Sequence, residues 1–354
     1  MMMMKKGDLC LVTGASGYLA SWIAKELLER GYRVRGTVRS LDDTQRVATL
    51  KQLLPGIELL AADLRDEAGW TPALAGCQWV FHVASPQAVS SERDRTGGAL
   101  SGTMHLMRAA LAEPAVRKIV VTSSEAAVAY GHPPAKRVIN EDDWTQLDVI
   151  AKSADYFRSK TLAERLAWKL AASAEANPRR IPVATVNPSL ILGPSLVPWS
   201  RFSLGLLSTI ARGKMPLMVD MTMRVVDVRD CARMHIAVMA DPLADGRRHL
   251  SMATTASFAG LARIIAARFG ERGFKPAIRM APAWLVRVLA GLSGEVRSIR
   301  THIGTELQYE TLSPHIYRYQ HRDLEAIVED SMNSMLAHGW LTPPRSAGPA
   351  RKAA

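Results

Sequence analysis

Apolar residues in the first half of the chain alternate between short continuous runs and longer segments with helical spacing. The continuous runs predict strands that are buried on both faces. The longer segments carry apolar residues three or four positions apart, which predicts amphipathic helices. The predicted strands are 9–13, 33–38, 57–61, 79–83, 118–122 and 183–187, and the predicted helices are 19–30, 44–54 and 100–111.

Strands that alternate with helices predict an α/β fold, here a Rossmann-type, doubly wound parallel sheet. We expect residues 1–187 to form this nucleotide-binding domain. Beyond it strands and helices no longer alternate regularly, and we expect residues 188–340 to form mostly a smaller C-terminal substrate lobe that partly returns to the first domain. Residues 341–354 are rich in Pro, Ala and basic residues and are expected to be a disordered tail. Further helices are expected at 202–211, 228–239, 258–268 and 323–337.

Composition excludes several classes of function. The net charge is +12, but the basic residues are scattered without interleaved aromatic residues, which argues against a nucleic-acid partner. No apolar run approaches the roughly 18 residues of a membrane span. The three cysteines lie far apart and form no CxxC pair, which favours a reducing, cytoplasmic setting. His132, His235 and His338 lack partners at metal-ligand spacing, so no metal site is expected.

A glycine-rich turn follows the first predicted strand, with the spacing Gly-x-x-Gly-x-x-Ala. Small residues let the backbone approach a pyrophosphate, and a helix N-terminus offers N–H groups and the positive end of a dipole. The position of this turn between a strand and a helix predicts a dinucleotide site rather than an ordinary turn. The residues expected at the cofactor are Gly14, Ser16, Gly17, Tyr18 and Leu19.

The end of the second strand predicts which dinucleotide binds. NAD sites place Asp or Glu about 20 residues after the glycines, where it accepts from the ribose hydroxyls. Here the strand ends at Arg39, whose guanidinium can form a charge-assisted fork with a 2′-phosphate, so we expect NADP(H). Arg46 either adds a second cation or is a solvated helix residue. Asp63 and Leu64, after the third strand, are also expected at the cofactor, where Asp63 either contacts the adenine or caps a helix.

Tyr156 and Lys160 are the candidates for proton chemistry. Their spacing of four residues places them on one face of a helix, and the alternative is an amphipathic helix with an exposed lysine. A neighbouring ammonium is expected to lower the pKa of the tyrosine from its usual value of about 10. Ser124, after strand 118–122, either donates to a carbonyl oxygen or caps a turn. Glu125 is expected to be a solvated or structural carboxylate.

Together these motifs resemble the extended short-chain dehydrogenase/reductases, in the group of dihydroflavonol reductase, cinnamoyl-CoA reductase and microbial aldehyde reductase. The matching segments are 13–20, 37–39, 80–86, 122–124, 156–160 and 187–194, and the resemblance covers about residues 8–340. It implies that Ser124 polarises the carbonyl, Tyr156 donates the proton, and Lys160 binds the ribose and tunes Tyr156. It also implies cofactor contacts from Val83, Ala84, Ser85, Pro188 and Ser189.

Two positions depart from the pattern of this group. His105 stands where such proteins often carry Asn, which leaves a polar relay near its helix in doubt. Ala129 stands where flavonoid reductases carry a substrate-contacting Asn, which argues against a flavonoid substrate.

The expected activity is the reversible, NADPH-dependent reduction of an aldehyde or ketone to an alcohol. The alternatives are an NAD(P)-dependent epimerase or dehydratase, a hydroxysteroid dehydrogenase, and a non-catalytic NADP-sensing protein. A monomer or homodimer acting on a small carbonyl compound is expected.

The substrate pocket is expected to be bounded by Pro86, Ala129, Tyr130 and the stretch 196–224, which includes Val197 and Trp199. Arg201 and Arg224 are surface arginines, or they receive a carboxylate or phenolate at the far end of the substrate.

Overall fold

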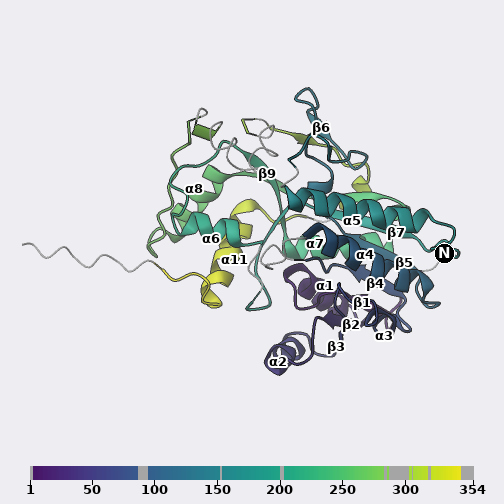
Figure 1. Ribbon diagram of the computed structural model, residues 1–354. Helices are drawn as coiled ribbons and strands as arrows, with labels where there is room; N and C mark the ends of the chain where they lie inside the picture. Colours follow the sequence, from purple (N-terminus) through teal and green to yellow (C-terminus); the bar gives the residue numbers. More distant parts are fainter. Residues whose placement is uncertain are drawn as a thin grey trace, which may run out of the picture.

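A parallel sheet with helices on both faces forms the centre of the molecule (Figure 1). The computed structural model describes residues 3–86, 95–151, 154–199, 203–282, 285–286, 303–304, 306–317 and 320–343. Within them, seven strands pair in the order β10-β7-β5-β4-β1-β2-β3, and every pairing is parallel. These strands are β1 Leu9–Val12, β2 Arg33–Val38, β3 Glu58–Ala61, β4 Trp79–His82, β5 Lys118–Thr122, β7 Val183–Pro188 and β10 Arg248–Ser251. The predicted Rossmann-type sheet is confirmed.

Side chains of the central strands enter two apolar layers. In β1, Cys10 and Val12 belong to the layer with helices α1 (Tyr18–Glu29) and α7 (Val228–Ala240), whereas Leu9 and Leu11 belong to the layer on the other face. That second layer contains residues of α3 (Trp70–Leu74), α4 (Arg95–Ala112) and α5 (Asp155–Ala172). Because both faces are covered, the strands need apolar residues at consecutive positions, which explains the runs in the sequence. Helix α2 (Thr44–Leu53) joins β2 to β3.

The chain beyond β7 builds a second group of elements and also returns to the main sheet. Strands β8 (Leu190–Leu192), β9 (Thr222–Asp227) and β11 (Thr254–Ser257) form a separate sheet. Helices α6 (Gly205–Ala211), α8 (Phe258–Phe269) and α11 (Leu324–Ala337) lie together beside it (Figure 1). In contrast, β10 is the edge strand of the main sheet, and α7 packs on α1. A single apolar cluster runs from the main sheet into this group.

Two strands of two residues each connect distant parts of the sequence. Strand β6 (Val138–Ile139) pairs in parallel with β12 (Gln308–Tyr309). Three short 3-10 turns complete the described elements, namely η1 (Glu125–Ala127), η2 (Pro242–Ala244) and η4 (Pro314–Tyr317). The β6–β12 pairing brings the C-terminal part of the chain close to the segment that follows β5.

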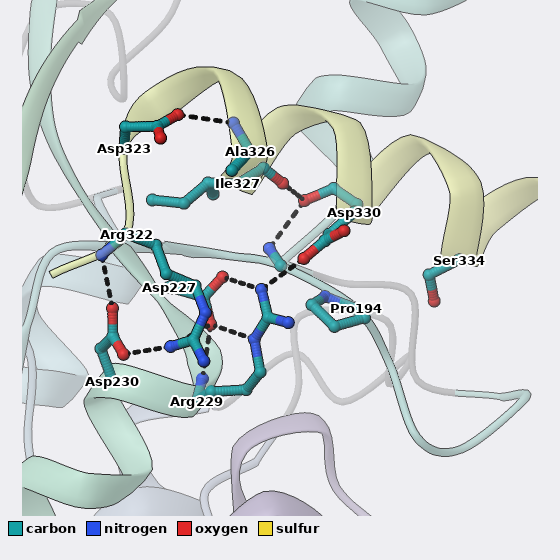
Figure 2. Close-up of polar contacts among 12 residues, drawn as sticks. Pro194, Asp227, Arg229, Asp230, Arg322, Asp323, Ala326, Ile327, Asp330 and Ser334 are labelled. Carbon is teal, nitrogen blue, oxygen red and sulfur yellow. Dashed lines mark hydrogen bonds and ion pairs between the residues drawn. The ribbon is translucent and has the colours of Figure 1, made fainter.

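An ionic cluster fixes α11 against the start of α7 (Figure 2). Asp227 is buried and caps α7 by accepting from the backbone N–H of Arg229. The Arg229 guanidinium lies 2.8 Å from Asp227 and 2.6 Å from Asp330 of α11. Arg322 pairs with the buried Asp230 through both its backbone and its side chain. Such pairs add little net stability but are costly to break, so they hold α11 in one position.

Three sequence expectations change with the structure. Leu341 was placed in the disordered tail, but its side chain is buried at 2% exposure and packs in the main core, whereas residues 344–354 lie outside the described part. The helix expected at 202–211 begins at Gly205 within the described residues, and Phe202 lies outside them. In addition, β6, β8, β9, β10, β11 and β12 were not predicted. Among the described helices, none combines the length and apolar character needed to cross a membrane.

Candidate active site and cofactor site

The glycine turn between β1 and α1 has the shape of an anion cradle. Gly14 has φ +66°, a left-handed conformation, and a Cβ there would lie 3.1 Å from the Cβ of Ala84. Gly17 is the N-cap of α1, and no described side chain caps that end or puts an acid in its first turn. The backbone N–H groups at the start of α1 therefore remain available to a phosphate group.

The carboxyl end of β4 is tied to this turn through Thr13. The Thr13 hydroxyl accepts from the backbone N–H groups of Val83 and Ala84, both at 2.9 Å. It also lies 3.2 Å from Nδ1 of the buried His82. Since both lone pairs of the hydroxyl are used, its hydrogen goes to Nδ1, and the proton of the neutral imidazole is on Nε2. Desolvation and the nearby Lys160 lower the pKa of His82 to about 3, so the ring stays neutral.

A pocket opens beside these strand ends and collects several of the predicted site residues. It lies at the carboxyl ends of β4 and β5, where ligands bind in doubly wound sheets. Its lining residues are Leu64, His82, Ala84, Ser85, Pro86, Ala99, Thr103, Val121, Thr122, Ser123, Lys160, Ala163 and Glu164. The sequence placed Leu64, Ala84, Ser85 and Lys160 at the cofactor and Pro86 at the substrate, and the fold brings these five together.

Arg39 is the cation at the end of β2, where an NAD site would carry an acid. Its side chain is 79% exposed, and its Nε lies 3.9 Å from Asp63. Asp63 is not a helix cap: its carboxylate accepts from the backbone and side chain of Arg65, which lowers its pKa. The weak, exposed Arg39–Asp63 pair leaves the guanidinium able to turn to another anion.

Arg46 contacts a residue that the sequence placed elsewhere. Its guanidinium lies 4.8 Å from the ring centroid of Trp199, and its Nε lies 3.4 Å from Asp43. Trp199 was expected on the substrate wall, but its indole N–H donates to the backbone carbonyl of Ser16, at 2.9 Å. Val197, expected on the same wall, is fully buried in the core. Trp199 therefore contacts the glycine turn and Val197 lies in the core, which differs from the substrate wall expected for both.

Ser124 and Tyr156 lie within contact distance although they come from different elements. Ser124 follows β5 and caps η1, and its Oγ is 3.3 Å from the Tyr156 hydroxyl. Oγ also accepts from the backbone N–H of Ala126, so its own hydrogen can be donated. Both readings of Ser124, as a cap and as a donor, therefore fit.

The pKa of Tyr156 moves in the opposite direction to the sequence expectation. Desolvation by the surrounding protein raises it, and the carboxylate of Glu125 raises it further. The hydrogen bond from Ser124 and the charge of Arg95 act the other way and are weaker than the desolvation. The expected lowering by Lys160 is not among the causes. The phenol of Tyr156 is therefore protonated at neutral pH, as a proton donor must be.

Lys160 lies one helical turn after Tyr156 on α5. Desolvation lowers the pKa of its ammonium to about 8, and the carboxylate of Glu164, one turn further on, opposes this shift. The ammonium form therefore prevails at neutral pH but is lost just above it.

Glu164 is a site residue that sequence reasoning missed. It is buried at 1% exposure, and it accepts from Ser123, from Asn187 at 2.8 Å and from Arg248 at 2.6 Å. The Asn187 amide also donates to the backbone carbonyl of Ser124, at 3.2 Å. The signal in the sequence was an acid four residues after Lys160, on the same face of the helix. Glu164 thus links α5, β7 and β10 to the backbone of Ser124.

The predicted substrate residues Ala129 and Tyr130 share one small apolar cluster, and the ring of Tyr309, which contacts Arg224, packs against the same cluster. Tyr130 packs on Phe157, with ring centroids 4.4 Å apart, and Phe157 lies 5.9 Å from the ring of Tyr156. Ala129 is 1% exposed and packs in a small apolar cluster. The guanidinium of Arg224 lies 5.2 Å from the ring centroid of Tyr309. Arg201 lies outside the described residues.

Three further expectations concern neighbouring positions. Pro188 is buried at the end of β7. The next residue, Ser189, donates its backbone N–H to the carbonyl of Ser251. His105 contacts the backbone carbonyl of Leu64, at 3.1 Å, so it holds the loop after β3. No group of three His, Cys, Asp or Glu side chains suited to a metal ion occurs in the described parts of the chain.

The chain is similar in sequence to known reductases, and the similarity extends over most of both chains. Cinnamoyl-CoA reductase CAD2 of Medicago truncatula is 34% identical over 268 residues, which cover 73% of this chain and 80% of that protein. An anthocyanidin reductase ((2S)-flavan-3-ol-forming) of Vitis vinifera is 33% identical over 284 residues, covering 75% and 82%.

Solved structures agree on the fold. Vestitone reductase from alfalfa (Medicago sativa L.) has a TM-score of 0.73 and 25% identity, covering 95% of this chain and 100% of that one. Gre2 from Candida albicans, solved with NADPH, has a TM-score of 0.75 and 22% identity, covering 94% and 99%.

A family pattern completes the comparison. The sequence model of the NAD dependent epimerase/dehydratase family matches residues 10–253, which include the glycine turn, Ser124, Tyr156 and Lys160. With these curated reductases as relatives, the chain belongs to the NAD dependent epimerase/dehydratase family.

Proposed function

We propose that the protein catalyses the NADPH-dependent reduction of an aldehyde or ketone to an alcohol. The observation that carries this proposal is the 3.3 Å contact between the hydroxyls of Ser124 and Tyr156, with Lys160 one turn away. Two hydroxyls at this distance can both contact one carbonyl oxygen. The identity of the relatives as reductases supports the same direction of chemistry.

The residues of the glycine turn fit a dinucleotide. Gly14 has no side chain, and a Cβ there would crowd Ala84, so the turn keeps its backbone accessible to a pyrophosphate. The uncapped N-terminus of α1 supplies backbone N–H donors for the same group. Arg39 and Arg46 bring two cations near this turn, and β2 ends without an acid. This charge arrangement favours a 2′-phosphate, and therefore NADP(H) over NAD(H).

In this mechanism the side chains bind and polarise the carbonyl group. NADPH, when bound, supplies the hydride. Ser124 donates to the carbonyl oxygen while negative charge develops on it. Tyr156 then gives its proton to that oxygen, and its raised pKa keeps it loaded at neutral pH. Lys160 lines the pocket and carries its charge at neutral pH, so its role in this proposal is to bind the ribose of the cofactor.

A substrate panel tests this proposal. The purified protein is mixed with NADPH or NADH and with matched aldehydes, ketones and sugar nucleotides, and the loss of absorbance of the reduced cofactor is followed. We expect turnover of aromatic or alkyl carbonyl compounds with NADPH. Turnover of sugar nucleotides alone would point to an epimerase or dehydratase and would contradict the proposal.

A further inference from the structure

Glu125 stands directly after Ser124 and carries a carboxylate that the mechanism above does not use. Its Oε1 accepts from the hydroxyl of Tyr309, which belongs to β12. Tyr309 packs against the same small apolar cluster as Tyr130, whose ring contacts Phe157 beside Tyr156, so the carboxylate lies on the side of the site formed by these rings. The side chain is partly exposed, and Oε2 accepts no hydrogen bond within the described part of the chain.

Arg224 lies beside the same tyrosine. Its guanidinium stacks on the ring of Tyr309, 5.2 Å from the centroid. Desolvation raises the pKa of Glu125 to about 7, and the hydrogen bond from Tyr309 and the charge of Arg224 act the other way, so the carboxylate is ionised above pH 7. One negative and one positive group therefore meet at Tyr309 from β9 and η1. A carboxylate ligand drawn to Arg224 would also face Glu125, so the pair gives little net attraction for an acid.

A neutral ligand that donates a hydroxyl hydrogen interacts differently with Glu125 and Arg224. A carboxylate oxygen holds lone pairs for more than one donor, and Oε2 has them unused. A hydrogen bond to an ionised carboxylate is stronger than one between neutral groups. A substrate hydroxyl can therefore bind Glu125 without bringing a charge of its own to the pair formed with Arg224.

We propose that Glu125 selects substrates that carry a hydroxyl group beside the reacting carbonyl, and that Arg224 balances the charge of this recognition point. The inference rests on the proposed reductase function and deepens it. In this proposal the hydroxyl end of the substrate lies beside η1 and β12. It takes the place of the expectation from the sequence that Arg224 receives a substrate carboxylate.

Three aryl ketones that differ in one group test the inference. They are 2-hydroxyacetophenone, its methyl ether 2-methoxyacetophenone, and the keto acid benzoylformate, each assayed with NADPH above pH 7, where Glu125 is ionised. The unmodified enzyme is expected to prefer the hydroxy ketone over its methyl ether by roughly tenfold or more in kcat/KM, the scale of one charge-assisted hydrogen bond. Equal efficiency on the hydroxy ketone and its ether, or a preference for benzoylformate, overturns the inference but leaves the reductase function intact. If none of a wider carbonyl panel is reduced, the reductase function itself fails.

Two variants separate recognition from structural support. Glu125→Gln is expected to reduce the preference for the hydroxy ketone to about twofold, because the hydrogen bond loses its charge. Tyr309→Phe removes the donor to Oε1 but keeps the ring under Arg224, and it is expected to retain the preference. If both variants abolish the preference equally, Glu125 acts only by anchoring β12, and the inference is wrong. The ratio measured on the unmodified enzyme decides the matter even where a variant does not fold.

Discussion

The guanidinium of Arg46 rests on the indole ring of Trp199, 4.8 Å from its centroid, although the two residues belong to distant parts of the sequence. Trp199 in turn is fixed to the glycine turn by its hydrogen bond to Ser16. The arginine is thereby held beside the turn and not left to move freely on α2. This relationship gives Trp199 a positioning role in the proposed choice of NADPH.

Trp199→Ala is expected to weaken the recognition of a 2′-phosphate. A cation–π contact at a partly exposed site contributes about 0.5–1 kcal/mol, so affinity for 2′,5′-ADP should fall by roughly two- to fivefold. The affinity for 5′-AMP, measured by calorimetry in the same way, should change less. Trp22→Ala is the matched control, because Trp22 bonds to the carbonyl of Pro194 in the same loop, whereas Arg46 stacks on Trp199. Equal losses for the two nucleotides would exclude the positioning role.

Arg39→Ala is expected to reduce the preference for NADPH over NADH. Loss of one charged contact to a phosphate costs about 1.5–3 kcal/mol, which corresponds to roughly ten- to a hundredfold in kcat/KM. The ratio of kcat/KM for the two cofactors measures the effect. An unmodified enzyme that uses both cofactors equally well would remove the basis for this assignment.

Arg248→Met is expected to destabilise the protein strongly. The change leaves the carboxylate of Glu164 buried without its guanidinium partner, which costs about 3–5 kcal/mol in other buried pairs. Urea unfolding measures the free energy directly. Arg268→Met is the control: Arg268 and Glu325 are both more than half exposed, and such surface pairs contribute about 0–1 kcal/mol. Similar free energies of unfolding for the two variants would mean that Glu164 is not held as described.

The pH dependence of reduction is expected to reflect Lys160. Desolvation depresses the pKa of the ammonium to about 8, so the charged form is present below that pH and is lost as the pH rises through it. Reduction should therefore decline above about pH 8. His82, whose pKa is depressed to about 3, stays neutral throughout this range and does not contribute. Lys160→Arg keeps its charge at every accessible pH and, if it retains activity, should lose this decline. A decline that persists unchanged in Lys160→Arg would assign it to another group.

The main sheet could be predicted from the sequence because its strands are covered on both faces. Strands such as β1 and β5 are continuous apolar runs, which only a buried parallel strand explains well. Strand β10 escaped prediction because it reads Arg-His-Leu-Ser. The guanidinium of Arg248 is paired with Glu164 and Nε2 of His249 with the carbonyl of Ala244, and the sequence does not reveal those partners.

Some features of the candidate site could likewise be predicted from the sequence, and others required the structure. The spacing of Tyr156 and Lys160 is local, and it places both on one helix whatever the rest of the chain does. The contact of Glu125 with Tyr309 depends on the pairing of two very short strands, β6 and β12, which carry no periodic signal. The direction of the Tyr156 pKa shift also required the structure, because desolvation depends on everything that packs around the phenol.

The central claim is that Tyr156 donates the proton to a substrate carbonyl, and Tyr156→Phe tests it most directly. The variant keeps the ring that packs near Phe157 and removes only the hydroxyl. The measurement is the single-turnover rate of NADPH oxidation with saturating carbonyl substrate, together with NADPH binding followed by fluorescence. We expect binding close to that of the unmodified protein and a rate at least about 10²-fold lower, the scale of a positioned general acid. A Tyr156→Phe protein that binds NADPH and reduces the substrate at a near-normal rate would contradict the account.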